Sequence, residues 1–199
     1  MTADKLKKVA LTQFGLHGYD GASLSLIATE VGMKKQSIYA HFKSKEDLFL
    51  STYSDSIALE FDFIHRFIEE HQSDSLKDLL HGFLRRSLER YTESNNTSFF
   101  LRTSFFPPLQ LEQLVKDGTN VYVAELEAIF LKVFHEKQET LREGLSAESA
   151  SLSFLTMMDG LLVEMLYGIP ERLEKRTAAS WNVYFLAISR PEEENSHES

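Results

Sequence analysis

Residues 18–50 read GYDGASLSLIATEVGMKKQSIYAHFKSKEDLFL, a stretch with the pattern of short helices joined by tight turns. Ser23 is suited to cap a helix that runs to Gly32, and a short third helix is expected to follow through Phe42. Gly32 can adopt the positive φ of a tight interhelical turn, and Ala28 is small enough for two helices to cross closely. The stretch therefore predicts a compact helix-turn-helix.

This helix pair would carry polar side chains in a pattern suited to DNA. Its apolar interior is expected to consist of Ile27, Val31, Ile38 and Phe42. The residues expected to project from the third helix are Lys34, Lys35, Gln36, Ser37 and Tyr39. The N-terminal end of a recognition helix meets base edges in the major groove, where Lys can donate to guanine and Gln can pair with adenine. Taken singly, each of these residues is also compatible with an ordinary solvated surface.

The same stretch resembles the DNA-binding domain of the TetR family of bacterial transcriptional regulators. Its landmarks stand in order: Tyr19 after Gly18, the cap at Ser23, Ile27-Ala28, Gly32, Ser37-Ile38-Tyr39, His41-Phe42 and residues 43–48. The resemblance implies that Ser25 faces the groove and that Lys45 holds a phosphate. It also implies that Tyr39 and His41 lie against the DNA backbone. The full set of expected DNA contacts is Ser23, Ser25, Lys34, Lys35, Gln36, Ser37, Tyr39, His41 and Lys45.

The net charge of −9 is unevenly distributed along the chain. Residues 1–50 hold seven Lys, no Arg and five acidic residues, a net charge of +2, which leaves −11 for residues 51–199. Because DNA binding needs cations at the phosphates, only the N-terminal part of the chain suits an anionic partner.

The whole sequence predicts an all-α protein of about nine helices, because apolar residues recur at helical spacing and convincing period-2 runs do not occur. The first helix is expected to stop near Gly15 to Gly18, and the fourth to begin after Ser44. Residues 93–97 are expected to form a polar loop between the fifth helix and an aromatic segment, residues 98–106.

The sequence also predicts three further helices and a division into three parts. A long helix is predicted over residues 109–138, an eighth from Ser146 to Tyr167, and a ninth from Pro170 to about Ser189. Residues 1–46 are assigned to an N-terminal three-helix DNA-binding domain and residues 47–190 to a helical bundle for ligand binding and dimerisation. The polar, acidic residues 191–199 are expected to be a disordered tail.

Aromatic residues indicate a ligand pocket in the second of these domains. The sequence has fifteen Phe and seven Tyr, and Pro107-Pro108 next to an aromatic segment would interrupt regular helix packing. The TetR resemblance implies an effector site among the fourth to eighth helices, and we expect a small hydrophobic or aromatic effector. The expected lining is Phe61, Phe83, Phe99, Arg102, Phe105, Tyr122 and Phe130. Each aromatic residue taken singly also suits ordinary core packing.

The last two helices have broad apolar faces that indicate a homodimer. Two such helix pairs meeting across a two-fold axis would form a four-helix bundle. The residues expected in this interface are Phe154, Met158, Leu162, Met165, Trp181, Phe185 and Ile188. Burial of both faces within one subunit is the alternative.

Signals for catalysis, metals, cofactors and membranes are weak. The seven His show no metal-ligand spacing, the Ser residues lack a nucleophile-elbow context, and no Gly-rich phosphate loop occurs. The sequence has no cysteine, which excludes disulfides and Cys-ligated zinc, and no apolar run approaches the roughly 18 residues of a membrane span.

These features favour a cytoplasmic, non-enzymatic DNA-binding regulator, which a small molecule would release from a palindromic operator of double-stranded DNA. Two alternatives stay open. One is a helical ligand-binding or enzymatic module with a vestigial helix-turn-helix, and the other is an interaction protein that works through its acidic C-terminal part.

Overall fold

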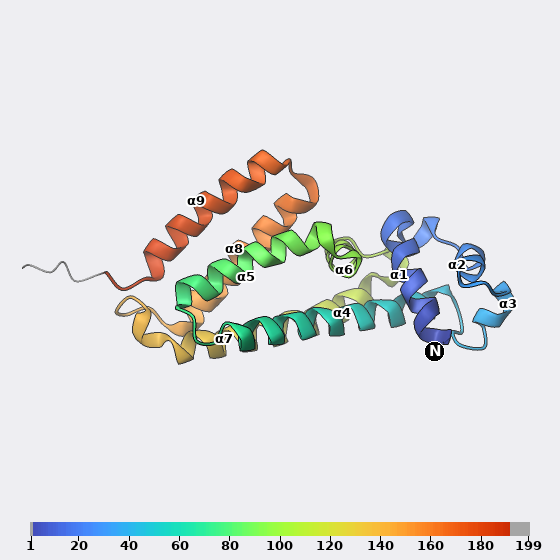
Figure 1. Ribbon diagram of the computed structural model, residues 1–199, viewed down its shortest axis with the longest axis horizontal. Helices are drawn as coiled ribbons and strands as arrows, with labels where there is room; N and C mark the ends of the chain where they lie inside the picture. The colour runs from blue at the N-terminus through green and yellow to red at the C-terminus, as the bar shows by residue number, and fades with distance from the viewer. Residues whose placement is uncertain (1, 192–199) are drawn as a thin grey trace, which may run out of the picture. The chain divides into compact units, whose positions relative to one another are not determined.

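The computed structural model describes residues 2–191, and in this part of the chain the fold is all-α (Figure 1). These residues form nine α-helices and two short 3₁₀-helices, and the only β-type pairing among them is an isolated bridge between Leu141 and Ser189. The predicted fold class is therefore confirmed. The tail predicted over residues 191–199 lies outside the described residues apart from Pro191.

The helices have the following bounds: α1 Thr2–Gly21, α2 Leu24–Val31, α3 Lys35–Ile38, α4 Lys45–Glu70, α5 Leu76–Glu93, α6 Asn95–Phe105, α7 Glu112–Glu136, α8 Ala147–Tyr167 and α9 Pro170–Ile188. The 3₁₀-helices are η1, Leu109–Leu111, and η2, Gln138–Thr140. Of the described helices, α8 alone has the length and apolar composition that crossing a membrane would need, and less than half of it is buried within the chain.

Serine hydroxyls cap five of these helices, which explains why most of the predicted starts are correct. The hydroxyl oxygens of Ser23, Ser44, Ser75, Ser94 and Ser146 each accept a hydrogen bond from the backbone N–H three residues later, at 3.0–3.2 Å. Pro170 occupies the first turn of α9, where its missing N–H has no cost. Each serine cap contributes roughly 1 kcal/mol to the stability of its helix.

Four predicted boundaries differ from the structure. The long helix predicted over residues 109–138 is observed as α7, which begins at Glu112 after η1 and ends at Glu136. The first helix continues to Gly21 past a kink at Gly18, whose φ of 68° is in a region open to glycine. Helix α3 ends at Ile38, so the chain up to Phe42 forms turns instead of more helix. The expected loop at residues 93–97 is wrong, because the Ser94 cap lets Asn95 begin α6 only one residue after α5 ends.

The described residues form two compact units, which group the chain differently from the predicted functional domains. Within residues 2–191, the first unit contains residues 2–72 and 86–123, and the second contains residues 73–85 and 124–191. Helices α5 and α7 each contribute residues to both units. The division into DNA-binding and ligand-binding domains concerns function and stays a prediction.

Aromatic packing joins three helices of the first unit. Phe49 of α4 is buried, and its ring centroid lies 4.9 Å from that of Phe14 and 5.1 Å from that of Tyr19, both on α1. Phe99 of α6 meets the same ring at 5.7 Å. Leu6 and Ala10 extend the buried face of α1. The start of α4 is therefore fixed by apolar contacts with α1 and α6.

A buried polar cluster joins α4, α5 and α6 farther along the first unit. The carboxylate of Glu60 accepts hydrogen bonds from Arg90 Nη2 at 2.9 Å, Asn96 Nδ2 at 2.8 Å and the Thr97 hydroxyl at 2.9 Å. The guanidinium of Arg90 also lies 3.8 Å from the centroid of the Phe63 ring. The side chains of Glu60 and Arg90 are only 6% and 14% exposed. This ion pair is therefore largely removed from water.

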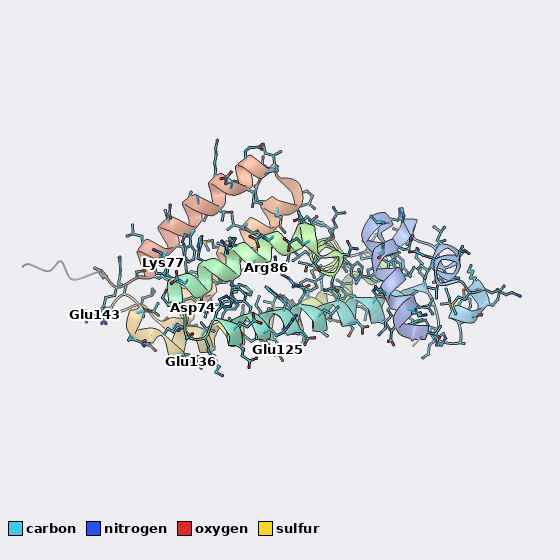
Figure 2. The ribbon with its side chains drawn as sticks, in the orientation of Figure 1. Asp74, Lys77, Arg86, Glu125, Glu136 and Glu143 are labelled. Atoms are coloured by element: carbon cyan, nitrogen blue, oxygen red, sulfur yellow. The ribbon has the colours of Figure 1, made fainter. Side chains whose placement is uncertain are left out.

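The second unit has an aromatic core of its own. Phe130 of α7 is fully buried and lies between Phe83 of α5, at 4.8 Å, and Phe154 of α8, at 5.4 Å. Trp181 of α9 stacks on His81 of α5 with ring centroids 4.8 Å apart. Lys77, labelled on α5 in Figure 2, lies over the ring of Phe185 at 5.4 Å. These contacts hold α9 against the first turns of α5.

Polar contacts fix both ends of α9 in the second unit. Glu164 of α8, which is buried, forms ion pairs with Arg172 and Arg176 near the start of α9. At the other end, the N–H of Arg142 donates to the carbonyl of Ile188 at 2.7 Å. Helix α9 is therefore tied to α8 at its start and to the segment after η2 at its end.

The buried ion pair of the first unit gives a stability prediction. Glu60→Ala should lower the free energy of unfolding by about 3–5 kcal/mol, because removal of one partner leaves the buried charge of Arg90 uncompensated. The matched control is Glu93→Ala. Glu93 is a 55% exposed ion-pair partner of Arg86, which is labelled on α5 in Figure 2. Its removal should lower the free energy of unfolding by less than about 1 kcal/mol. Denaturant unfolding followed by circular dichroism measures both. Equal losses in the two variants would contradict the assigned importance of the buried pair.

Candidate nucleic-acid interface

The turn between α2 and α3 has the geometry that the sequence predicts. Gly32 has a φ of 80°, and its N–H donates to the carbonyl of Thr29 at 3.0 Å. The next N–H, that of Met33, donates to Ala28 at 2.9 Å, so the last carbonyls of α2 are satisfied. The expected interior is also present, since Ile27, Ala28, Ile38 and Phe42 are buried and Val31 is half-buried.

The polar residues of α3 and the following turn face solvent. The exposed set comprises Lys34, Lys35, Gln36, Ser37, Tyr39 and His41. Within residues 2–191, none of these six side chains takes part in a hydrogen bond or ion pair of the chain. Tyr39 is 52% exposed even though its ring is apolar. The α3 surface therefore presents two ammonium groups, an amide, two hydroxyls and an imidazole to a ligand outside the chain.

The two serines expected on the DNA side of α2 differ in what their hydroxyls do. Ser25 is exposed. Ser23 is half-buried, and its hydroxyl accepts the capping hydrogen bond from Leu26 at 3.2 Å. A capping hydroxyl keeps its own proton for donation, so Ser23 can still reach a phosphate oxygen while it stabilises α2.

Lys45 occupies a more enclosed position than the sequence suggests. Its Nζ lies 4.5 Å from the centroid of the Tyr19 ring and 3.5 Å from the backbone carbonyl oxygen of Asp20. Burial lowers the pKa of Lys45 from its ordinary value, and the negative charge of Asp20 acts in the opposite direction. The ammonium is thus held against the end of α1 instead of extending freely into water.

Comparison with known proteins now identifies this arrangement. Residues 6–52 match the family model described as bacterial regulatory proteins, tetR family. This N-terminal stretch is therefore similar to the DNA-binding domain of TetR-family regulators. The matched residues cover α1 from Leu6 onward, α2, α3 and the first turns of α4.

A curated relative agrees with this similarity. It is 35% identical over 104 residues to the negative transcriptional regulator IcaR of the biofilm operon icaADBC in Staphylococcus aureus, a match that covers 47% of this chain and 54% of IcaR. The chain thus spans about half the length of the curated relatives it matches.

Solved structures show the same fold at low sequence identity. A TetR transcriptional regulator from Chloroflexus aurantiacus has a TM-score of 0.73 at 17% identity, covering 96% of this chain and 97% of that one. A protein from Saccharomonospora viridis, solved in complex with choline, has a TM-score of 0.74 at 18% identity, covering 95% of this chain and 98% of that one.

The residues predicted to line an effector site are distributed over both units. Phe61, Phe99, Arg102, Phe105 and Tyr122 belong to the first unit, whereas Phe83 and Phe130 belong to the second. In the first unit, Phe61 and Tyr122 are half-buried with ring centroids 5.1 Å apart, and Phe99 is fully buried. Arg102 is exposed, and its Nε donates to the hydroxyl of Tyr91 at 3.0 Å.

Two residues beside these aromatic rings are absent from the expected lining, although Phe100 lies in the predicted aromatic segment. Phe100 lies 4.7 Å from Tyr122 and 6.1 Å from Tyr53, so it continues the series of rings. The hydroxyl of Tyr53 forms hydrogen bonds of 2.8 Å with those of Ser104 and Thr119. The sequence signal available for Tyr53 was its helical spacing, four residues after Phe49 and four residues before Ile57.

The residues predicted for a dimer interface separate into two groups. Phe154, Met158, Trp181 and Ile188 are buried within the chain, and Leu162, Met165 and Phe185 are half-buried. The apolar residues of α8 and α9 that are exposed are Leu152, Val163, Tyr167, Val183 and Leu186. Among residues 2–191, no group of three or more His, Asp or Glu side chains is arranged to hold a metal ion.

Proposed function

We propose that this chain is a cytoplasmic DNA-binding repressor that binds a palindromic operator as a homodimer and is released by a small-molecule effector. The observation that carries the proposal is the α3 surface, where six exposed polar side chains have no partner within the described chain, inside a domain that matches the TetR family. IcaR, which is a negative transcriptional regulator, supports repression as the outcome. An enzymatic role is not part of the proposal.

The proposed DNA contacts divide into two roles. Lys35 and Gln36 lie in the first turn of α3, the part of a recognition helix that reaches base edges. Tyr39, His41 and Lys45 follow α3 or begin α4, where they would contact the phosphate backbone. Sequence preference would therefore come from α3, and most of the salt-dependent affinity would come from the residues around it.

These two roles give different expected results for single substitutions. Gln36→Ala should change the preferred base at one operator position at a cost of about 1–3 kcal/mol, because a base-edge contact is lost. Lys45→Ala should weaken binding to every sequence and reduce the slope of affinity against salt by about one, because phosphate contacts carry no sequence information. Selection of bound fragments from random-sequence DNA, followed by salt titration, measures both effects.

The selection of DNA fragments also distinguishes a DNA-binding repressor from a ligand-binding module. A wild-type protein that is folded but retains no DNA fragment at low salt would favour a ligand-binding module with a vestigial helix-turn-helix. A changed sequence preference in Lys45→Ala, with none in Gln36→Ala, would invert the assigned roles.

The proposed partner of α8 and α9 is a second copy of the chain. Helix α8 is strongly apolar, yet less than half of it is buried within the subunit. Val183 and Leu186 of α9 are 70% and 73% exposed, one turn apart on the same helix. Exposed apolar surface of this kind is normally covered in an interface, and an isologous contact would cover it on both subunits. The buried residues Phe154 and Trp181 would then support the interface from behind.

Charge insertion tests this dimer. Leu186→Glu and Leu162→Glu should shift the protein to monomer and reduce operator affinity, because each would place an unpaired charge in the interface. Val121→Glu is the matched control, since Val121 is an exposed apolar residue, 63% accessible, on α7. Sedimentation velocity at micromolar concentration measures the assembly state. A monomeric wild-type protein would remove the basis for the dimer.

The proposed effector is a small, mainly apolar or aromatic molecule that binds among the rings of α4, α6 and α7 in the first unit. The half-buried rings of Phe61 and Tyr122 offer apolar surface to such a ligand. Because Arg102 is exposed and bonded to Tyr91, it adds no preference for an anion. The choline-bound protein of similar fold supports small-molecule binding, and a cation such as choline would favour aromatic faces.

Ligand release of DNA gives a quantitative test. We expect the best ligand from a panel of fatty acids, aromatic acids and quaternary amines, including choline, to weaken operator binding by roughly 5–150-fold. Phe61→Ala should reduce the affinity for that ligand while ligand-free DNA binding stays nearly unchanged. Leu59→Ala, at a 50% exposed position on the same helix, serves as the control. A panel in which no compound changes operator affinity would leave a constitutive DNA-binding protein.

A further inference from the structure

The end of α1 encloses the ammonium of Lys45 from two sides. The positive φ of Gly18 turns the chain so that Tyr19 packs between Phe14, at 6.1 Å, and Phe49, at 5.1 Å. The face of the Tyr19 ring lies under Lys45 Nζ, and the Asp20 carbonyl oxygen lies beside it. Because Tyr19 is held by two other rings, its position and that of Asp20 are fixed relative to the start of α4.

The carboxylate of Asp20 is occupied by a residue far along the chain. Gln110 of η1 donates from Nε2 to Asp20 Oδ1 at 3.0 Å. Asp20 thus meets the η1 segment through its carboxylate and Lys45 through its carbonyl oxygen. The negative charge of this carboxylate already acts on the ammonium of Lys45, which lies within reach of it. Glu46 is a further acidic side chain near Tyr19.

We propose that Gln110 and Asp20 are positioning residues for Lys45, so that the η1 segment influences DNA affinity directly through the end of α1. This inference rests on the proposed role of Lys45 in DNA binding. While the Gln110 amide holds the Asp20 carboxylate, the ammonium stays over Tyr19 and remains available to a phosphate. When that hydrogen bond is broken, the carboxylate is free to pair with the ammonium and competes with the phosphate for it.

Coupling from η1 to Lys45 through Asp20 does not require helix α4 to tilt. Helix α4 contains Lys45 at its first position, but the contacts that hold the ammonium come from Tyr19 and Asp20 of α1. A displacement of η1 would therefore change the surroundings of Lys45 even if the axis of α4 did not move. A ligand that displaces η1 could weaken DNA binding by this route alone.

The test uses Gln110→Ala and a matched control. Gln110→Ala should weaken binding to the operator fragment selected with the wild-type protein by about two- to fivefold, as expected for one exposed hydrogen bond. In a Lys45→Ala background the same change should have no further effect. Gln113→Ala removes a hydrogen bond of similar length, from Gln113 Nε2 to Asp117 Oδ1 at 2.9 Å, and should leave DNA binding unchanged. Asp20→Asn should abolish the effect of Gln110→Ala, since no carboxylate is then released.

A second measurement needs no DNA. The pKa of the Lys45 ammonium, followed by NMR in the full chain, should rise in Gln110→Ala and stay unchanged in Gln113→Ala, because a pairing carboxylate favours the charged form.

The outcomes separate the positioning role from the proposed function. Equal behaviour of Gln110→Ala and Gln113→Ala in both measurements would overturn the positioning role. So would a DNA-binding loss that is just as large in the Lys45→Ala background. A wild-type protein that binds no DNA would instead overturn the proposed function, and the NMR result would still report on the contact itself.

Discussion

The packing of Phe49 against rings from α1 and α6 is the contact on which the first unit depends. Its ring meets Phe14, Tyr19 and Phe99 at 4.9–5.7 Å, and each aromatic pair of this kind adds about 0.5–1.5 kcal/mol beyond burial of its area. Phe49 lies four residues after Lys45, so the same contact fixes the start of α4. The position of the expected phosphate contact is therefore determined mainly by apolar packing.

The distribution of charge along the chain suits DNA binding by the N-terminal part alone. Residues 1–50 carry a net charge of +2 and include the exposed lysines of α3, while residues 51–199 carry −11. Arg90 is paired with buried Glu60, and Arg172 and Arg176 are paired with Glu164. These three arginines are thus committed to ion pairs within the chain. The acidic remainder would repel phosphates, which discourages binding in unproductive orientations.

Local signals made much of the fold predictable, and tertiary contacts account for what was missed. The starts of α2, α4, α8 and α9 follow from Ser23, Ser44, Ser146 and Pro170, whose effects on a helix terminus are local. The boundary at Ser94 was missed because Asn95 to Thr97 have the composition of a loop, although a capped first turn tolerates the same polar residues.

The candidate site was predictable to a similar degree. Helical spacing correctly indicated the exposed residues of α3, but it could not show that Lys45 lies over Tyr19. The contact between Asp20 and Gln110 joins residues 90 positions apart, and neither residue has a sequence signal that pairs it with the other. In α8 and α9 the apolar residues extend around most of the helix, so their pattern could not separate the inward residue Trp181 from the outward residue Leu186.

The single tryptophan is a fluorescence probe of the second unit. Trp181 is buried and stacks on His81 in the second unit, and the sequence contains no other indole. Intrinsic tryptophan emission therefore reports on the packing of α9 against α5 and carries no direct signal from α2 and α3. Because the chain also lacks cysteine, a single cysteine introduced on α3 could be labelled with a dye, and no other position would react. The two probes would follow the two units separately in one sample.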